Sequence, residues 1–345
     1  MDTRTAVGHL TRPIKITPGE DTGWGFRLLG YGYRNGNVLR TGNLILSGVE
    51  VVEGGQYDTE STAIQMYNMI GSQMNIITKS SIHDCKSFCL DIDNGRNIRI
   101  ENNVFYKGRV FHVRALHVYN YKFSNNLMMI VTSRPTLKAK ELIACYGSWL
   151  PVNQVSDRVT VSDNLCVGSS MHGFAIPYVP CDSVNNYAFA GNTVGTSAVG
   201  FVFNKAGGGC MAATQIAAYA CRICQIASSG GTRRLMLKNF MMADCGRAVT
   251  LRFGLGGRRE SDMTGFLEDS YITAISRPEC RKCYGGGATD CTGNHAVRML
   301  AVTVNGESLP HAFGSSFDVI CKEEAFDSKA FLTNVTFENY NQNYG

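Results

Sequence analysis

The sequence predicts an all-β fold, a single right-handed parallel β-helix (solenoid) over residues 1–345, with Cys- and Gly-rich loop insertions near 205–234 and 254–295. Three observations lead to this prediction: a short Asn-containing motif recurs along the chain, short alternating strands lie between its copies, and charges are few while Gly is frequent. Charged residues make up 18% of the chain, below the roughly 25% usual in soluble domains. Such a composition suits a β-rich stack of turns better than long amphipathic helices.

The recurring motif has Asn, Asp or another polar residue first, then apolar residues alternating with others, then a small or polar turn. Its copies begin at Ser80, Asn102, Asn125, Asp163, Gly191, Lys238, Glu268 and Thr333. The first three lie roughly 22 to 23 residues apart, a usual length for one solenoid coil, and the wider later gaps require inserted loops or degenerate coils. Because stacked Asn side chains form hydrogen-bonded ladders in other in-register β stacks, we expect such ladders at these turns.

Short strands are expected between the motifs, for example over 97–100, 158–161 and 200–203, where apolar and polar residues alternate as in half-buried strands. Successive coils would pair these strands in parallel. An antiparallel sandwich or barrel with Asn-rich turns is the alternative, although Asn-Gly hairpin turns are few. In the first insertion, the Ala-rich run from Ala212 to Ala220 is expected to form either a short strand or a helical piece.

The cysteine content indicates an oxidising compartment. The chain has 13 Cys, an odd number, so at least one thiol is free or bonds to another chain. The disulfide candidates are Cys85, Cys89, Cys221, Cys224, Cys280, Cys283, Cys291 and Cys321. The Cys-x-x-Cys pairs are too far apart for the common zinc-ribbon spacing, so disulfides are preferred over a zinc site.

Targeting and charge narrow the function classes further. No apolar stretch is long enough to span a membrane, and the N-terminus lacks the apolar core of a signal peptide. Together with the cysteines, this suggests a segment of a longer secreted or membrane-anchored protein. An intracellular protein with reduced thiols is the alternative. The net charge of +5 is scattered, which argues against nucleic acid as a partner.

Several segments carry a family resemblance through their order along the chain. They are residues 6–12, 54–60, 161–176, 296–299, 317–321 and 329–337. They resemble the extracellular β-helix region of the fibrocystin-like (polyductin) family and, more distantly, cell-surface proteins that bind or degrade hyaluronan. The resemblance implies a non-enzymatic structural or adhesive module of a large cell-surface, ciliary or matrix protein, without a cofactor. Its expected partners are other copies of itself, other surface or matrix proteins, or glycans, and assembly into a fibre or coat is one expectation.

A polysaccharide-binding or polysaccharide-cleaving β-helix, hyaluronidase-like or lyase-like, is the second hypothesis. The hyaluronan-degrading relatives carry a His-rich segment where residues 63–68 read Ala-Ile-Gln-Met-Tyr-Asn, so inherited cleavage is not expected. The weak catalytic alternative is Asp91 with Asp93, which alternation places on one strand face. The alternative interpretation is that these two carboxylates are solvated surface positions or ligands of a calcium ion. A carboxylate or aromatic stripe along consecutive coils would favour this hypothesis.

Two further features complete the candidate sites. His112, Arg114 and His117 form a basic stretch able to contact an anionic sugar, with structural histidines as the preferred interpretation. Asn334 begins an Asn-Val-Thr glycosylation acceptor, which requires this side chain to face outward from an expected strand.

Overall fold

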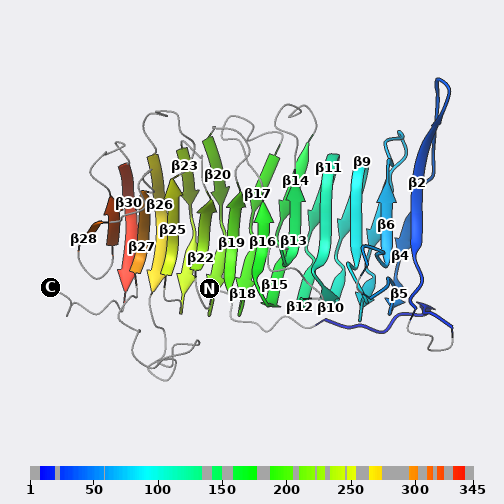
Figure 1. Cartoon of the computed structure of the whole chain (residues 1–345), viewed down its shortest axis with the longest axis horizontal. Coiled ribbons are helices and arrows are strands. Elements are labelled where there is room, and N and C mark those ends of the chain that lie inside the picture. Colours follow the sequence, from blue (N-terminus) through cyan, green and yellow to red (C-terminus); the bar gives the residue numbers. More distant parts are fainter. Residues whose placement is uncertain are drawn as a thin grey trace. The chain divides into compact units, whose positions relative to one another are not determined.

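The computed structural model describes residues 8–19, 24–57, 59–133, 142–149, 158–176, 187–204, 210–221, 224–229, 234–244, 247–253, 264–273, 295–301, 309–313, 317–321 and 329–338. Every regular element in these ranges is a β-strand, and parallel pairs dominate (Figure 1). The all-β prediction and the parallel pairing are therefore confirmed. The chain divides into two compact units, 1–171 and 172–345. Within the described ranges there is no helix of the length and hydropathy that a membrane span would need.

The strands of the first unit follow one another closely, and all but two have eight residues or fewer. They are β1 (Ile14–Ile16), β2 (Leu28–Asn35), β3 (Val38–Thr41), β4 (Ile45–Ser47), β5 (Val49–Val52), β6 (Ile64–Tyr67), β7 (Asn75–Thr78), β8 (Ser81–His83), β9 (Leu90–Glu101), β10 (Val104–Arg109), β11 (Phe111–Ser124), β12 (Leu127–Thr132), β13 (Ala144–Trp149), β14 (Val159–Ser162) and β15 (Leu165–Ser169). The expected strands at 97–100 and 158–161 lie within β9 and over β14, respectively.

These strands pair in three parallel ladders. One ladder runs β1–β5–β8–β10–β12–β15. The second runs β2–β6–β9–β11–β13, and the third runs β4–β7–β9–β11–β14 through the later halves of the long strands. The chain visits the ladders in rotation, so each strand pairs with strands from the preceding and following rounds. The described antiparallel strand pairs are few, and the hairpin β2–β3 is one of them.

At several corners a residue with a left-handed backbone precedes a buried polar residue. Asn102 (φ 58°) and Asn125 (φ 55°) occupy this strained backbone region, which Asn tolerates better than most residues. The next residues, Asn103 and Asn126, are 1% and 2% exposed. Thus the two asparagines of each Asn-Asn pair have different roles, one for the backbone turn and one for the interior.

The buried asparagines form the predicted ladder. Asn103 Nδ2 donates to Asn126 Oδ1 at 3.0 Å, and Asn126 Nδ2 donates to Asn164 Oδ1 at 3.0 Å. Their sequence separations are 23 and 38 residues, so the longer round keeps the same corner. Ser80 begins the row, because its N–H donates to Asn103 Oδ1 while its hydroxyl accepts the N–H of Val49. The row satisfies polar backbone groups that the corner would otherwise bury without partners.

Apolar side chains fill the interior between the three ladders. Val51, Ile82, Phe105, Met128 and Cys166 stand in register across one ladder and are fully buried. Neighbouring residues on the same strands point outward, as the two-residue period of a strand requires. The outward rows therefore carry the candidate functional residues.

The second unit repeats this pairing with different strands. They are β16 (His172–Ile176), β17 (Tyr187–Ala190), β18 (Thr193–Gly195), β19 (Val199–Asn204), β20 (Cys210–Thr214), β21 (Ala217–Tyr219), β22 (Cys224–Ser229), β23 (Arg234–Lys238), β24 (Met241–Ala243), β25 (Arg247–Phe253), β26 (Thr264–Thr273), β27 (His295–Ala301), β28 (Leu309–Phe313), β29 (Phe317–Cys321) and β30 (Lys329–Glu338). Its ladders are also parallel, for example β16–β19–β22–β25–β27–β29.

The predicted insertions contain strands of these ladders. Within 205–234, strands β20, β21 and β22 pair in parallel with β23, β24 and β25. The Ala-rich run is therefore strand and not helix. Within 254–295, β26 pairs with β23 and β24, while residues 254–263 and 274–294 lie outside the described residues.

Candidate functional site

The acidic pair predicted from the sequence lies on the outward face of β9. In register, Asp91 stands between Gln65 of β6 and Arg114 of β11. Arg114 Nε donates to Asp91 Oδ1 at 2.8 Å, and its Nη2 donates to Oδ2 at 2.9 Å. Asp91 is 1% exposed although its strand face points outward. The side chains on the neighbouring strands cover this carboxylate, so it is not open to a substrate.

Arg114 is itself packed and held in one orientation. Its guanidinium carbon lies 4.7 Å from the centre of the Phe88 ring, a cation–π geometry. Burial by itself would lower the pKa of Arg114, but the hydrogen bonds and negative charge of Asp91 outweigh burial and raise it. Arg114 therefore stays charged and neutralises Asp91 in a two-pronged ion pair, an arrangement typical of structural recognition between neighbouring strands.

Asp93 is more accessible and has a different partner. His117 Nδ1 lies 3.0 Å from Asp93 Oδ1, and the His117 side chain is 50% exposed. The adjacent outward positions on β6 and β2 are Tyr67 and Tyr31, whose rings stack with centroids 5.7 Å apart. The aromatic stripe sought for a polysaccharide surface thus covers two consecutive strands and ends at Asp93.

The pair Asp91 and Asp93 lacks the arrangement of a glycosidase. That chemistry needs one carboxyl group kept protonated as an acid beside a second, accessible carboxylate. Here the buried carboxylate is neutralised by Arg114 and the accessible one contacts His117.

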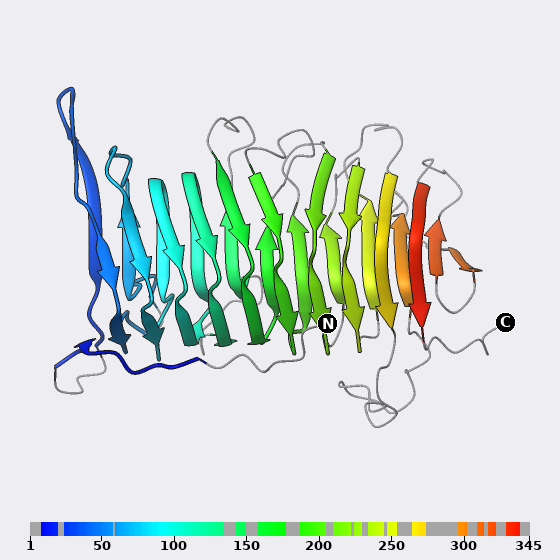
Figure 2. The same cartoon turned by 180° about the vertical axis from the view of Figure 1, so that it is seen from behind.

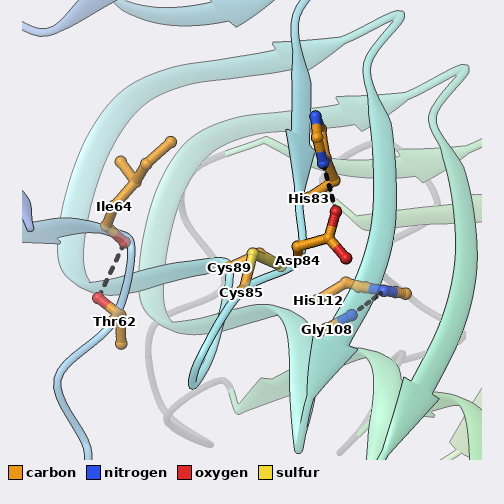
Figure 3. The surroundings of a disulfide bond; sticks show 8 residues. All are labelled: Thr62, Ile64, His83, Asp84, Cys85, Cys89, Gly108 and His112. Carbon is orange, nitrogen blue, oxygen red and sulfur yellow. Dashed lines mark hydrogen bonds and ion pairs between the residues drawn. A yellow bond between two sulfur atoms is a disulfide. The ribbon is translucent and has the colours of Figure 1, made fainter. Parts of the chain in front are cut away.

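Two disulfides are present among the described residues, both in the first unit. Cys85 and Cys89, two of the disulfide candidates, are bonded to each other and close the short connection between β8 and β9 (Figure 3). Cys145 and Cys166 join β13 to β15, and the sequence did not predict this pair. Both of these cysteines are fully buried at inward strand positions. Cys-x-x-Cys spacing pointed to other cysteines instead, and the alternation of strand residues does not single out Cys145, because residues 143–148 are all buried.

The remaining disulfide candidates have varied placements. Cys221 is buried, and its Sγ donates to the Tyr219 carbonyl at 3.7 Å. Cys224 and Cys321 lie on β22 and β29, but their side chains are not described. Cys280, Cys283 and Cys291 lie outside the described residues. Pairing of these six cysteines stays a prediction.

Two histidines near the Cys85–Cys89 disulfide, His83 and His112, are held by neighbouring groups of the protein (Figure 3). His83 lies between two carboxylates, with Nδ1 2.7 Å from Asp84 and Nε2 at an ion-pair distance of 3.4 Å from Glu50. His112 is fully buried, and its Nε2 accepts the N–H of Gly108 at 3.1 Å. A side chain on Gly108 would clash, because a Cβ there would lie 2.4 Å from His112 Cδ2. No group of His, Cys, Asp and Glu within the described ranges has the arrangement of a metal site.

The buried state of His112 predicts an acid-sensitive contribution to stability. Burial lowers the pKa of His112 to about 3, although an interaction with the Ile130 backbone acts in the opposite direction. In the unfolded chain a histidine titrates near 6.5. Between these values the unfolded state binds one more proton, so stability falls as pH decreases from about 6.5 to about 3, by roughly 1.4 kcal/mol per pH unit from this group.

The matched variant is His112→Gln, which keeps an acceptor for Gly108 but does not titrate. Chemical denaturation of both proteins at pH 7, 5 and 4 measures the difference between their free energies of unfolding. The other titrating groups cancel in this difference, which should change in favour of the variant as pH falls. Parallel pH dependence of the two proteins would contradict the assignment.

Asn334 is exposed and lies on β30 with a left-handed backbone (φ 50°). Its Nδ2 donates to Asp269 Oδ1 of β26 at 3.1 Å. The side chain therefore meets the condition of facing outward, although a glycan there would replace the contact with Asp269. Glycosylation of Asn334 stays a prediction.

No family model matches this chain, and no curated protein matches it. The likeness to the fibrocystin-like family therefore stays a proposal that rests on the residues named above.

Proposed function

We propose that the chain is a right-handed parallel β-helix that serves as a non-enzymatic structural or adhesive module of a larger extracellular, cell-surface or ciliary protein of the fibrocystin-like kind. The parallel ladders support the solenoid, because each adds strands in the same rotation. The two disulfides fit an oxidising compartment. The neutralised Asp91 supports a role without catalysis.

One observation carries the assembly role: exposed large apolar side chains gather at the start of the ladders. Among the residues whose side-chain exposure the structure describes, they all lie between Ile14 and Tyr67, except Ile130 and Leu332. The same region holds β1, β2 and β4, each of which begins a ladder and has a described parallel partner on one side only. Open strand edges beside exposed apolar side chains favour addition of further strands. Stacking of such ends would build a rod or coat.

The test is self-association of the chain and its loss on charging this end. Leu29→Lys combined with Ile45→Lys places charges on two exposed positions, 50% and 59% accessible, beside the open edges. Sedimentation velocity over a concentration series should show association of the wild-type chain and monomers of the double variant.

The matched control is Ile130→Lys, which charges an exposed position away from these edges. Lys107 already occupies the equivalent corner one round earlier, with φ 50° against 61° at Ile130, so a lysine fits there. Association unaffected by the double variant, or lost equally in the control, would contradict the proposal, as would a wild-type chain that is monomeric throughout.

A polysaccharide-binding surface is the second candidate, and the stacked Tyr31 and Tyr67 beside Asp93 favour it. Aromatic rings next to a few polar groups are typical of sugar-binding surfaces. The short length of the stripe makes this the lesser candidate.

A further inference from the structure

The N-terminal strap, defined as residues 8–16, crosses the outward face of the β5–β8–β10–β12 ladder before it pairs with β5 as β1. Gly8 lies against β10 and β12, where a Cβ would stand 2.9 Å from Val104 and 3.0 Å from Leu127. Further along, the Leu10 carbonyl accepts a hydrogen bond from Ser81 of β8. Figure 2 shows this segment in dark blue, passing strand after strand of the first unit.

The surface beneath the strap is one outward row. In register, Glu50, Ser81, Val104 and Leu127 stand side by side on four consecutive strands, with Met129 next to them. Glu50, Ser81 and Val104 are 6%, 0% and 9% exposed, so this outward row is nearly as buried as the core. We call these five residues the strap groove.

Glu50 anchors the strap by charge and hydrogen bonding. Its Oε2 accepts the Arg12 N–H at 3.1 Å, and its Oε1 lies 3.5 Å from Lys15 Nζ. Burial would raise the pKa of Glu50, but the Arg12 N–H and the Lys15 charge outweigh burial and lower it. Lys15 itself is 54% exposed, and the strap side of this ion pair is therefore open to solvent.

The strap groove needs a covering segment more than the strap needs this particular groove. Without a strap, a buried carboxylate, a buried hydroxyl and several apolar side chains would be left uncovered, which is costly. The strap has only three residues of strand, and Ile14 remains 60% exposed. Few hydrogen bonds from strap side chains to the backbone of the other strands are described, and Arg12 Nε with the Lys79 carbonyl is one of them. The contacts of the strap therefore depend little on its exact sequence.

We propose that the strap groove is a binding site for an extended peptide whose occupant, besides the chain's own strap, is the strap of a second copy. A strap makes the same contacts in its own groove as in that of a neighbour, so exchange loses no interaction. Whether a groove holds its own strap or the strap of a neighbour depends on the protein concentration relative to the effective concentration of the tethered strap, which is about mM for a short tether. Crowded copies on a surface would therefore become linked by exchanged straps, independently of end stacking.

The test uses a diazirine amino acid at Leu10 in unlabelled full-length chains mixed with ¹⁵N-labelled wild-type chains. After incubation and illumination, mass spectrometry identifies the strand that is cross-linked and whether it carries the isotope. We expect cross-links to β8, with an isotope-mixed share that rises from near zero in dilute solution toward half in concentrated solution. The same amino acid at Ile130, on the body of the chain, reports cross-linking by random collision.

Cross-links to β8 that remain within one copy at every concentration would overturn the exchange, and cross-links that miss β8 would overturn the groove. A second measurement mixes Lys15→Glu chains with Glu50→Lys chains. Each variant repels its own strap, while the acidic strap of the first suits the groove of the second. Heterodimers by sedimentation are expected only in the mixture, and their absence would also overturn the proposal. Repeating the cross-linking in the Leu29→Lys, Ile45→Lys background separates strap exchange from end stacking.

Discussion

Replacing Asn126 with Ala is expected to lower the free energy of unfolding by at least about 3 kcal/mol, because four buried polar groups each lose a hydrogen bond, and a buried polar group left without a partner costs about 1–3 kcal/mol. Asn126 Oδ1 accepts hydrogen bonds from the N–H and the Nδ2 of Asn103, each at 3.0 Å. Its Nδ2 donates to the Ile100 carbonyl at 2.9 Å and to Asn164. Alanine leaves no donor or acceptor there, and at 2% exposure water has little access. Chemical denaturation followed by circular dichroism measures the loss.

The matched control is the preceding residue of the same turn. Asn125 is exposed and left-handed (φ 55°), so Asn125→Gly keeps the backbone geometry without touching the ladder. Its effect should stay within about 0.5 kcal/mol, as for other surface substitutions. Equal losses for the two variants would show that the corner is sensitive as a whole and that the ladder has no special role.

Replacing Arg114 with Met is expected to destabilise the fold by about 3 kcal/mol, the lower end of the range for breaking a buried ion pair. The variant leaves Asp91 charged at 1% exposure, with Gln65 Nε2 at 3.5 Å as its remaining described partner. The lower end applies because the Arg114 side chain is 22% exposed, so water reaches this pair in part. The free energy of unfolding from denaturant titration gives the magnitude.

The double variant Asp91→Leu with Arg114→Met is the decisive comparison. Replacing both partners removes the uncompensated charge, so the double variant should be clearly more stable than Arg114→Met. A double variant less stable than Arg114→Met would contradict an uncompensated charge at Asp91, and a double variant less stable than wild type would show that the ion pair contributes more than its desolvation costs. A hyaluronan-cleavage assay on the same proteins addresses the enzymatic alternative: cleavage by wild type that Asp91→Asn abolishes without loss of stability would favour a catalytic carboxylate.

The asparagines show how far a local pattern predicts the fold. The Asn motif located the corners, and the ladder of Asn103, Asn126 and Asn164 follows that prediction. One copy of the motif in the second unit differs from this pattern. Asn239 is the left-handed turn residue (φ 54°), and the apolar Phe240 takes the buried place after it. Which of two adjacent residues faces inward depends on strand register, and the motif alone does not specify register.

The candidate site was less predictable than the fold. Asp91 and Asp93 share a face as alternation requires, but the partner that neutralises Asp91 lies 23 residues further along the chain. The number of residues between neighbouring strands of a ladder sets that pairing, and this number varies with each inserted loop. The pairing of Cys145 with Cys166 was missed for the same reason, since Cys145 lies outside the recurring motif.

Local physical chemistry was enough to predict, from the sequence by itself, short strands of alternating residues and corners at Asn and Asp, whereas the parallel pairing was expected from the repeat of the motif along the chain. The strands and corners follow from two-residue alternation and from backbone angles that particular residues tolerate. Only the tertiary structure decided which outward rows are buried, that Arg114 covers Asp91, and that residues 8–16 lie across Glu50 and Ser81. Those contacts join residues far apart in the chain, and their free energy depends on register and burial that exist only once the rounds have stacked.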